Sequence, residues 1–301
     1  MTITQLNDTC AIPGQIEFIK GKGDFPLARI DNGRACALIS IYAGQVLSFR
    51  PANQAHDLLF VSDAAYYRQG KAIKGGIPVC WPWFGPDPEE RGRPAHGFVR
   101  NRPWTVRATE TLADGDTRIT LGLVDSPETR AIWPFAFDLS LRVTVGNGLG
   151  VELFTRNTGD QPFTITQALH SYFNVGAIGQ VRVLGLEDTD YLDKAGDGNR
   201  HTQAGTVGFE QEVDRIYLDV QPELLIDDAA YGRRIGISST GSRTAVVWNP
   251  WADIAADMGD LRDDDYQRFV CVETANAAAD MIEINPGGEY RLGADYRYES
   301  A

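Results

Sequence analysis

Short runs in which apolar and polar residues alternate with a period of two recur along most of this 301-residue chain. Such alternation is typical of strands with one buried face and one solvated face. Two of these runs, Thr105–Thr111 and Thr117–Val124, flank Asp114-Gly115, a dipeptide that strongly favours a hairpin turn. Helical periodicity over more than ten residues is nearly absent. The sequence therefore predicts an all-β fold, arranged as a large antiparallel β-sandwich.

The other predicted strands are alternating runs or short apolar runs. They are Ala37–Phe49, Leu139–Val145, the run that begins at Val151, Phe163–Gln167, Ile216–Val220, Arg234–Ser239, Thr244–Trp248, Phe269–Glu273 and Tyr290–Tyr298. Short helical turns are predicted at Asp63–Tyr67 and Asp253–Met258. No internal repeat and no Ser/Gly-rich linker marks a boundary, so we expect one domain over residues 1–301.

Composition excludes several classes of protein. A formal net charge of −13 argues against binding to nucleic acid or anionic lipid, because the mean field repels phosphates. No uninterrupted apolar stretch reaches the ~18 residues of a membrane-spanning helix. The N-terminal residues do not resemble a secretory signal, and four widely spaced cysteines indicate free thiols rather than disulfides or structural zinc. We expect a cytoplasmic monomer.

One segment differs from the rest in charge. Residues 68–107 hold eight Lys and Arg against three Asp and Glu, and six prolines there predict rigid extended loops. Concentrated positive charge on rigid loops of an acidic protein indicates a local anion site. The alternative is a basic face that pairs with acidic loops such as Asp257–Asp265. Charge alone leaves both open.

The chain has four histidines, and a lone histidine in a β protein is more often structural than catalytic. His56 and His201 lie in polar, loop-like surroundings and are expected at the surface. His96 precedes Gly97, which permits close backbone approach, and His170 follows a predicted strand.

Glu273 is unusual because it ends the apolar run Phe269–Glu273. A carboxylate at the end of a buried strand needs a partner or a function. In a structural role, the Glu273 carboxylate forms a salt bridge or returns to water at the strand end. In a functional role, burial raises its pKa towards neutrality, which suits a general base.

Six motifs follow one another along the chain. They are Gly75-Gly76-Ile77-Pro78-Val79-Cys80-Trp81-Pro82-Trp83-Phe84-Gly85, His96-Gly97-Phe98-Val99-Arg100-Asn101, His170-Ser171-Tyr172-Phe173-Asn174, Val213-Asp214-Arg215-Ile216-Tyr217, Trp248-Asn249-Pro250-Trp251 and Val270-Cys271-Val272-Glu273. In this order they resemble the motifs of the hexose-6-phosphate mutarotases, or glucose-6-phosphate 1-epimerases, of the galactose-mutarotase-like superfamily. The match runs from about residue 15 to the C-terminus. The resemblance implies a β-supersandwich and an enzyme that needs no cofactor or metal.

The resemblance also implies roles for individual residues. His170 would be the general acid and Glu273 the general base, and a protonated His170 beside an ionised Glu273 would be mutually stabilising. His96 would hydrogen-bond the sugar near its ring oxygen. Asp214 would accept hydrogen bonds from sugar hydroxyls, with a salt bridge to Arg215 or to a distant arginine as the alternative.

Recognition of a phosphate would fall to the basic segment. Lys74 and Arg100 are the best candidates, with Arg68 as a third. The family commonly has arginine immediately before the Gly-Gly pair, where this chain has Lys74. Trp83 and Trp248 are expected to pack in the core, although either side chain has the shape to stack on a sugar.

The function implied is interconversion of the α and β anomers of a hexose 6-phosphate, with glucose 6-phosphate as the first candidate. The alternatives are an aldose 1-epimerase acting on neutral sugars and a non-catalytic regulator that binds a sugar phosphate.

Overall fold

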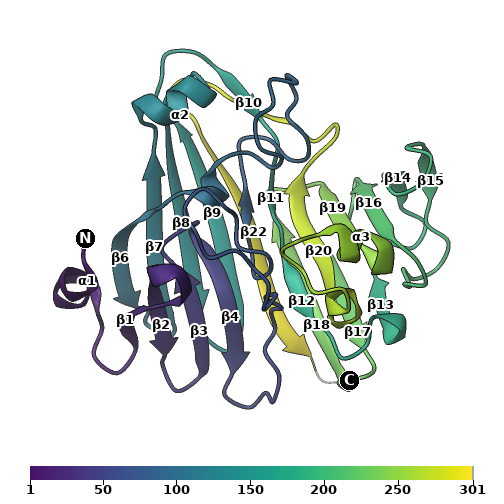
Figure 1. The fold of residues 1–301 in the computed structure, drawn as a ribbon, viewed down its shortest axis with the longest axis horizontal. Coiled ribbons are helices and arrows are strands. Elements are labelled where there is room, and N and C mark those ends of the chain that lie inside the picture. Colours follow the sequence, from purple (N-terminus) through teal and green to yellow (C-terminus); the bar gives the residue numbers. More distant parts are fainter. Residues whose placement is uncertain (300–301) are drawn as a thin grey trace.

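The computed structural model describes residues 1–299, and most of these residues lie in antiparallel strands. The predicted all-β sandwich is confirmed. Figure 1 shows the N-terminal strands on the left and the strands of the C-terminal half on the right.

One large sheet, called here the long sheet, carries the longest strands. In spatial order its strands are β13 (Val181–Leu184), β17 (Glu223–Asp228), β18 (Arg233–Thr240), β22 (Glu289–Glu299), β9 (Leu149–Asn157), β8 (Phe137–Val145), β7 (Thr117–Val124) and β6 (Thr105–Thr111). Buried positions alternate with partly exposed ones along β8 and β9, and nearly all their apolar side chains are buried, as expected for strands with one face against a core. The predicted hairpin β6–β7 is confirmed, and β8 and β9 form a second hairpin from the predicted strands at 139–145 and from 151.

A second large sheet, called here the site sheet, holds the residues of interest. In spatial order its strands are β15 (Arg200–Thr202), β14 (Asp190–Asp193), β16 (Val213–Leu218), β19 (Thr244–Asn249), β20 (Phe269–Asn276), β11 (Gln167–Leu169) and β5 (Val79–Cys80), and β12 (Tyr172–Asn174) also pairs with β20. Smaller sheets are formed by β1 (Ile16–Lys20), β2 (Pro26–Asp31), β3 (Ala35–Ser40) and β4 (Gln45–Pro51), and by β10 (Phe163–Ile165) with β21 (Ile282–Ile284).

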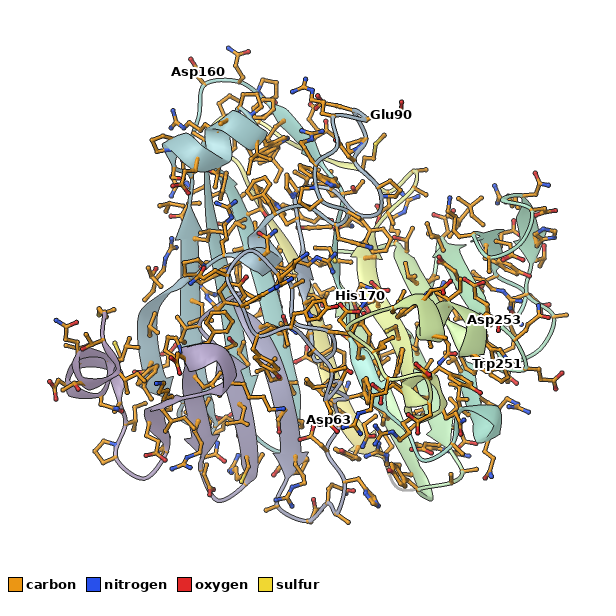
Figure 2. All side chains as sticks on the ribbon, in the orientation of Figure 1. Asp63, Glu90, Asp160, His170, Trp251 and Asp253 are labelled. Atoms are coloured by element: carbon orange, nitrogen blue, oxygen red, sulfur yellow. The ribbon has the colours of Figure 1, made fainter. Side chains whose placement is uncertain are left out.

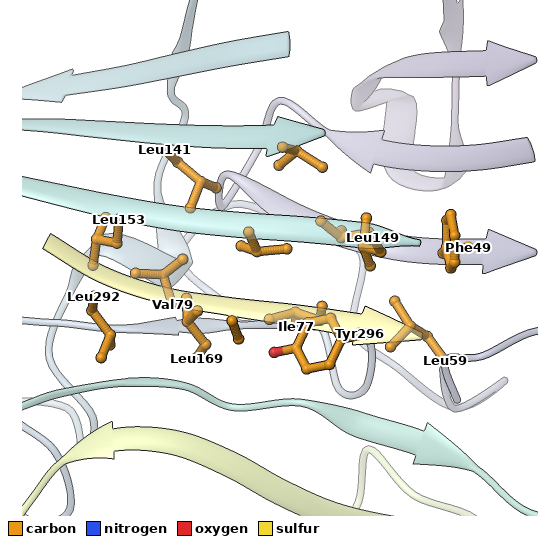
Figure 3. Close-up of a cluster of buried hydrophobic side chains, with 14 of the residues drawn as sticks. Phe49, Leu59, Ile77, Val79, Leu141, Leu149, Leu153, Leu169, Leu292 and Tyr296 are labelled. Carbon is orange, nitrogen blue, oxygen red and sulfur yellow. The ribbon is translucent and has the colours of Figure 1, made fainter. Parts of the chain in front are cut away.

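The main core lies where these sheets face one another. Figure 3 shows part of it, with Leu141 and Leu153 from the long sheet near Leu169 from the site sheet. All three side chains are at most 1% exposed. At about 25 cal/mol per Å² of apolar surface removed from water, such burial is the main term that holds the sheets together.

Helices are short and lie outside the sheets. They are α1 (Ile3–Cys10), α2 (Pro127–Ile132) and α3 (Trp251–Asp257), with 3-10 turns η1 (Lys22–Asp24), η2 (Val99–Asn101), η3 (Ile178–Gln180) and η4 (Asp265–Arg268). The predicted turn at 253–258 corresponds to α3, whereas α1 and α2 were not predicted and residues 63–67 are not helical. Capping boxes at Thr2 and Ser126 begin α1 and α2 and were the available signal. Within residues 1–299, no helix combines the length and apolarity that a membrane crossing requires.

Two runs predicted as single strands are each divided in the structure. The run Ala37–Phe49 is divided into β3 and β4 by a turn in which Ala43 and Gly44 have positive φ values of 72° and 57°. The apolar character continues through this turn because it is itself buried, so hydrophobicity alone gave no break. Phe163–Gln167 is similarly divided into β10 and β11, which pair with different strands.

Candidate active site

Strand register brings the candidate catalytic residues together on the site sheet. In β20, Glu273 is the register partner of Val246 in β19. Leu169, the last residue of β11, is the partner of Thr274. The next residue in each antiparallel strand is therefore His170 on one side and Glu273 on the other. Figure 2 shows His170 in the middle of the molecule, whereas Glu90 lies on an outlying loop.

His170 and Glu273 form a buried pair. His170 Nδ1 lies 3.4 Å from Glu273 Oε1, and the two residues are 7% and 2% exposed. Neither His170 Nδ1 nor Glu273 Oε2 has a hydrogen-bond partner in residues 1–299. Buried polar atoms are seldom left unpaired, so two such atoms side by side indicate that a ligand completes the site. Glu273 also lies inside β20 rather than at its end, which corrects the predicted strand boundary and removes the alternative that its carboxylate returns to water.

Burial favours the neutral forms of both groups. It raises the pKa of Glu273, with a further contribution from the charge of Asp214 and an opposing one from Arg100. It lowers the pKa of His170 well below the usual value, and the neighbouring His96 and Arg100 add to this. Desolvation therefore opposes the mutual attraction expected between a protonated His170 and an ionised Glu273. The neutral pair and the charged pair hold the same number of protons and differ only in which of the two side chains carries the proton.

His96 lies beside this pair with a defined tautomer. Its ring centroid is 5.6 Å from that of His170, in an edge-on arrangement. The backbone N–H of Gly85 donates to the ring nitrogen Nδ1 of His96 at 3.3 Å, and the backbone N–H of His96 donates to the Gly85 carbonyl at 2.7 Å. Burial, with Arg100 and Lys74, lowers the pKa of His96 to about 3. Because Nδ1 accepts, a neutral His96 carries its proton on Nε2 and presents a donor.

A glycine after His96 is required by the local backbone. Both His96 and Gly97 have positive φ, at 62° and 71°. A Cβ atom on Gly97 would overlap the backbone carbonyl of Trp81. The H-G pair of this motif therefore has a physical cause, since only glycine permits the approach that seats His96 at the site sheet.

Asp214 lies on β16, which is separated from β20 by β19 in the site sheet. It is the register partner of Trp248, which in turn pairs with Cys271. Burial, and secondarily the charge of Glu212, raises the pKa of Asp214 to about 6. The alternative of a salt bridge is wrong, because no arginine pairs with Asp214 within residues 1–299, and Arg215 instead donates to Gln203 at 3.0 Å. The strand alternation explains this, since adjacent residues point to opposite faces.

Lys74 is already paired with an acidic loop. Its Nζ lies 3.4 Å from Asp260 Oδ1 and 3.8 Å from the sulfur of Met258. The two charged side chains are 18% and 23% exposed. For Lys74 the structure therefore shows the alternative considered above, a basic residue held against the loop 257–265.

Arg100 and Arg68 differ in their surroundings. Arg100 is half-buried, and its Nη2 donates to the Ala95 carbonyl at 3.0 Å. It has no ion pair to any residue in 1–299, yet its charge contributes to the shifted pKa values of His96, His170 and Glu273. Arg68 is exposed and lies over the ring of Tyr66 at 5.3 Å. Among the described contacts, none joins Arg68 to the histidines or to Glu273, so its role stays a prediction.

An aromatic wall beside the pair was not fully predicted. The Tyr172 ring stacks on His170 with centroids 4.8 Å apart, and Trp248 meets His170 edge-on at 5.9 Å. The signal for Tyr172 was its place two residues after His170, which puts both on one face of an extended chain. Trp83 is buried under the Arg93 guanidinium, as the core-packing prediction required.

The remaining predicted features lie elsewhere. His56 stacks on Tyr231 and His201 contacts Asp197, both at exposed positions as predicted. All four cysteines are free thiols.

Comparison with known proteins decides the family. The family model described as aldose 1-epimerase matches residues 26–297. The chain belongs to the aldose 1-epimerase family. Its place there makes it an isomerase of the mutarotase type and confirms the family resemblance of the six motifs.

Individual members of the aldose 1-epimerase family cover nearly the whole chain. An Escherichia coli protein named "Putative glucose-6-phosphate 1-epimerase" is 38% identical over 256 residues, which is 85% of this chain and 84% of that protein. A Cenchrus ciliaris protein of the same name is 38% identical over 265 residues, covering 85% and 79%. A crystal structure from Salmonella typhimurium, described as a "putative mutarotase", superposes with a TM-score of 0.90 at 33% identity and covers 97% of this chain and 96% of that one.

Proposed function

We propose that this epimerase interconverts the α and β anomers of a hexose 6-phosphate, with glucose 6-phosphate as the first candidate. The observation that carries the proposal is the buried, hydrogen-bond-deficient pair of His170 and Glu273 in the field of Arg100 and Lys74. The pair supplies proton transfer, and the two cations give a reason for a phosphorylated substrate. The names of the curated relatives support the same substrate class.

The reaction needs one group that accepts a proton and another that donates one. In the proposed mechanism, ionised Glu273 takes the proton of the C1 hydroxyl while protonated His170 gives a proton to the ring oxygen, and the C1–ring oxygen bond breaks. This leaves an open-chain aldehyde beside a neutral pair, which is the arrangement that burial favours. Rotation about C1–C2 and reversal of both transfers closes the ring as the other anomer. Each positioned proton transfer is typically worth ~10²–10⁴ in rate.

The other polar groups are proposed to orient the sugar. His96, with its proton on Nε2, donates a hydrogen bond near the ring oxygen, which has lone pairs and no proton. Asp214 accepts from a sugar hydroxyl, and Trp248 offers an apolar edge between them. No metal or cofactor is invoked, because the steps above balance with these side chains alone.

The phosphate is proposed to bind Arg100 and Lys74. Arg100 supports this most strongly, because its guanidinium is not committed to a carboxylate in residues 1–299 and matches phosphate geometry. Lys74 is a point charge already shared with Asp260, an observation that favours the alternative of a neutral-sugar epimerase.

Anomer exchange by NMR tests the substrate. Glucose and glucose 6-phosphate are offered at equal concentration and their exchange rates are compared with the uncatalysed rates. We expect faster catalysed exchange of the phosphorylated sugar. Faster exchange of glucose would replace the proposal by a neutral-sugar epimerase, and binding without exchange would replace it by a sugar-phosphate-binding regulator.

We further propose that the chain acts in the cytoplasm as a monomeric single domain that does not bind nucleic acid. Light scattering during size-exclusion chromatography tests the oligomeric state, with a mass near 33.1 kDa expected.

A further inference from the structure

Asp260 occupies an unusual place, because its carboxylate faces a cation proposed to bind substrate. It comes from the loop between α3 and η4, and this loop is fixed at its far end. Leu261 is 5% exposed in an apolar cluster that includes Tyr172 and Phe269. Asp265 is fully buried and accepts a hydrogen bond from the Ser62 hydroxyl at 2.7 Å. The position of Asp260 is therefore set by packing on both sheet and loop residues.

The contact between Lys74 and Asp260 is close without being optimal. The Nζ–Oδ1 distance of 3.4 Å is longer than the 2.7–2.9 Å of a good charge-assisted hydrogen bond. Burial lowers the pKa of Lys74 and Arg100 adds to this effect, while Asp260 opposes it. Asp260 thus compensates an ammonium that is largely removed from water and that also feels the positive charge of Arg100.

We propose that Asp260 is a specificity-determining residue whose carboxylate holds the anion position at Lys74 in the ligand-free protein and competes there with the phosphate of the substrate. With Lys74 and Arg100 as cations, Asp260 reduces the charge presented to a phosphate dianion from two positive charges to one. A neutral sugar has no group that competes with Asp260. The residue therefore sets how strongly phosphorylated sugars are preferred over neutral ones, an inference that rests on the proposed function.

Removing this charge has a defined consequence. In Asp260→Asn the KM for glucose 6-phosphate falls by about three- to tenfold, the range expected for one partly screened charge near an ion pair. The KM for glucose stays unchanged. The gain shrinks as ionic strength rises, because added salt screens the repulsion that the substitution removes.

The experiment compares the parent protein, Asp260→Asn and Asp263→Asn. Asp263 is an exposed residue of the same loop, so its variant has the same change in net charge without a contact to Lys74. Exchange kinetics are measured with glucose 6-phosphate and glucose at low and high salt, and inorganic phosphate is used as a competitive inhibitor. We expect only Asp260→Asn to lower the KM for glucose 6-phosphate and the inhibition constant of phosphate. Asp260→Ser serves as a second uncharged variant if the first does not fold.

The outcomes separate this inference from the proposed function. An equal phosphate inhibition constant in Asp260→Asn and Asp263→Asn would overturn the role of Asp260, and so would a raised KM, which would mean that Asp260 holds Lys74 in place for the substrate. Faster exchange of glucose than of glucose 6-phosphate in the parent protein would instead overturn the proposed substrate.

Discussion

The catalytic pair and the candidate phosphate site are built by different parts of the molecule. His170 and Glu273 are set by strand register at the site sheet and are at most 7% exposed, and Figure 2 shows His170 in the middle of the molecule. Lys74 and Asp260 come from connecting segments and meet through their side chains, whereas Arg100 lies in η2, and all three residues are more exposed than the pair. The difference indicates that the proton-transfer chemistry is tied to the fold, whereas preference for a charged substrate depends on a few loop residues that can change without altering the sheet.

Removing both members of the pair tests the sheet side of this comparison and has the largest expected effect. The double variant His170→Asn with Glu273→Gln should lose at least ~10³ of the catalysed exchange with either sugar, because two positioned proton transfers are lost. NMR exchange rates provide the measurement. The matched control is His201→Asn with Glu283→Gln, which changes the same residue types at exposed positions and should leave exchange unaltered. Parent-like exchange in the double variant would show that these residues do not move the protons.

Arg100→Met tests the candidate phosphate site, which is formed by Lys74, Arg100 and Asp260. We expect kcat/KM for glucose 6-phosphate to fall by about 10–100-fold, the value of a charge-assisted hydrogen bond or two, with a much smaller change for glucose. Lys74→Met should cost less, since its ammonium is shared with Asp260. Arg91→Met, in the same basic segment but exposed and paired with Glu89, is the control. Equal losses for both sugars would remove the distinction between chemistry and charge recognition.

Much of the sheet structure around the catalytic pair was predictable from the sequence, because the alternation of apolar and polar residues indicates which side chains share a face of a strand. Residues 105–111 and 117–124 were placed correctly as strands. The pairing of β11 with β20, whose partners are more than a hundred residues apart, was implied only through the family motifs, since sequence spacing does not give long-range register. The desolvation of the pair was not predictable in the same way, because burial on both sides cannot be judged from one strand.

The candidate phosphate site was less predictable from the sequence. Concentrated charge in residues 68–107 indicated an anion site or an ion-paired face, and the structure combines both, with Lys74 paired and Arg100 unpaired among residues 1–299. Which cation pairs depends on how two irregular segments pack, and irregular segments carry no periodicity. Prolines fixed their extended character but not their neighbours.

The dependence of folding stability on pH tests Asp214, a residue of β16 that is proposed to bind substrate and therefore joins the sheet to substrate recognition. Its pKa rises from 3.8 to about 6, so the folded state holds this proton more tightly than the unfolded state does. Stability is therefore lost as pH rises through the window from about 4 to 6. Asp214→Asn should raise the free energy of unfolding by about 1–2 kcal/mol at pH 7.5, after allowance for partial exposure, and by little at pH 4. Denaturant titrations at the two pH values measure this, and an equal gain at both would contradict the assignment.

Ser62→Ala has the smallest expected effect and tests how firmly the acidic loop is held. Loss of the hydrogen bond from Ser62 to the buried Asp265 should cost about 1–2 kcal/mol of stability. Exchange of glucose should remain at the parent rate, because the pair lies on the sheet. A large loss of glucose exchange would show that the loop and the sheet chemistry are not separable.

A crystal structure with bound glucose 6-phosphate tests the central claim most directly. The account predicts that C1 and the ring oxygen lie within hydrogen-bond reach of both Glu273 and His170, with the phosphate at Arg100 and Lys74 and with Asp260 displaced from Lys74. A sugar bound where no single ring can contact both His170 and Glu273 would contradict it.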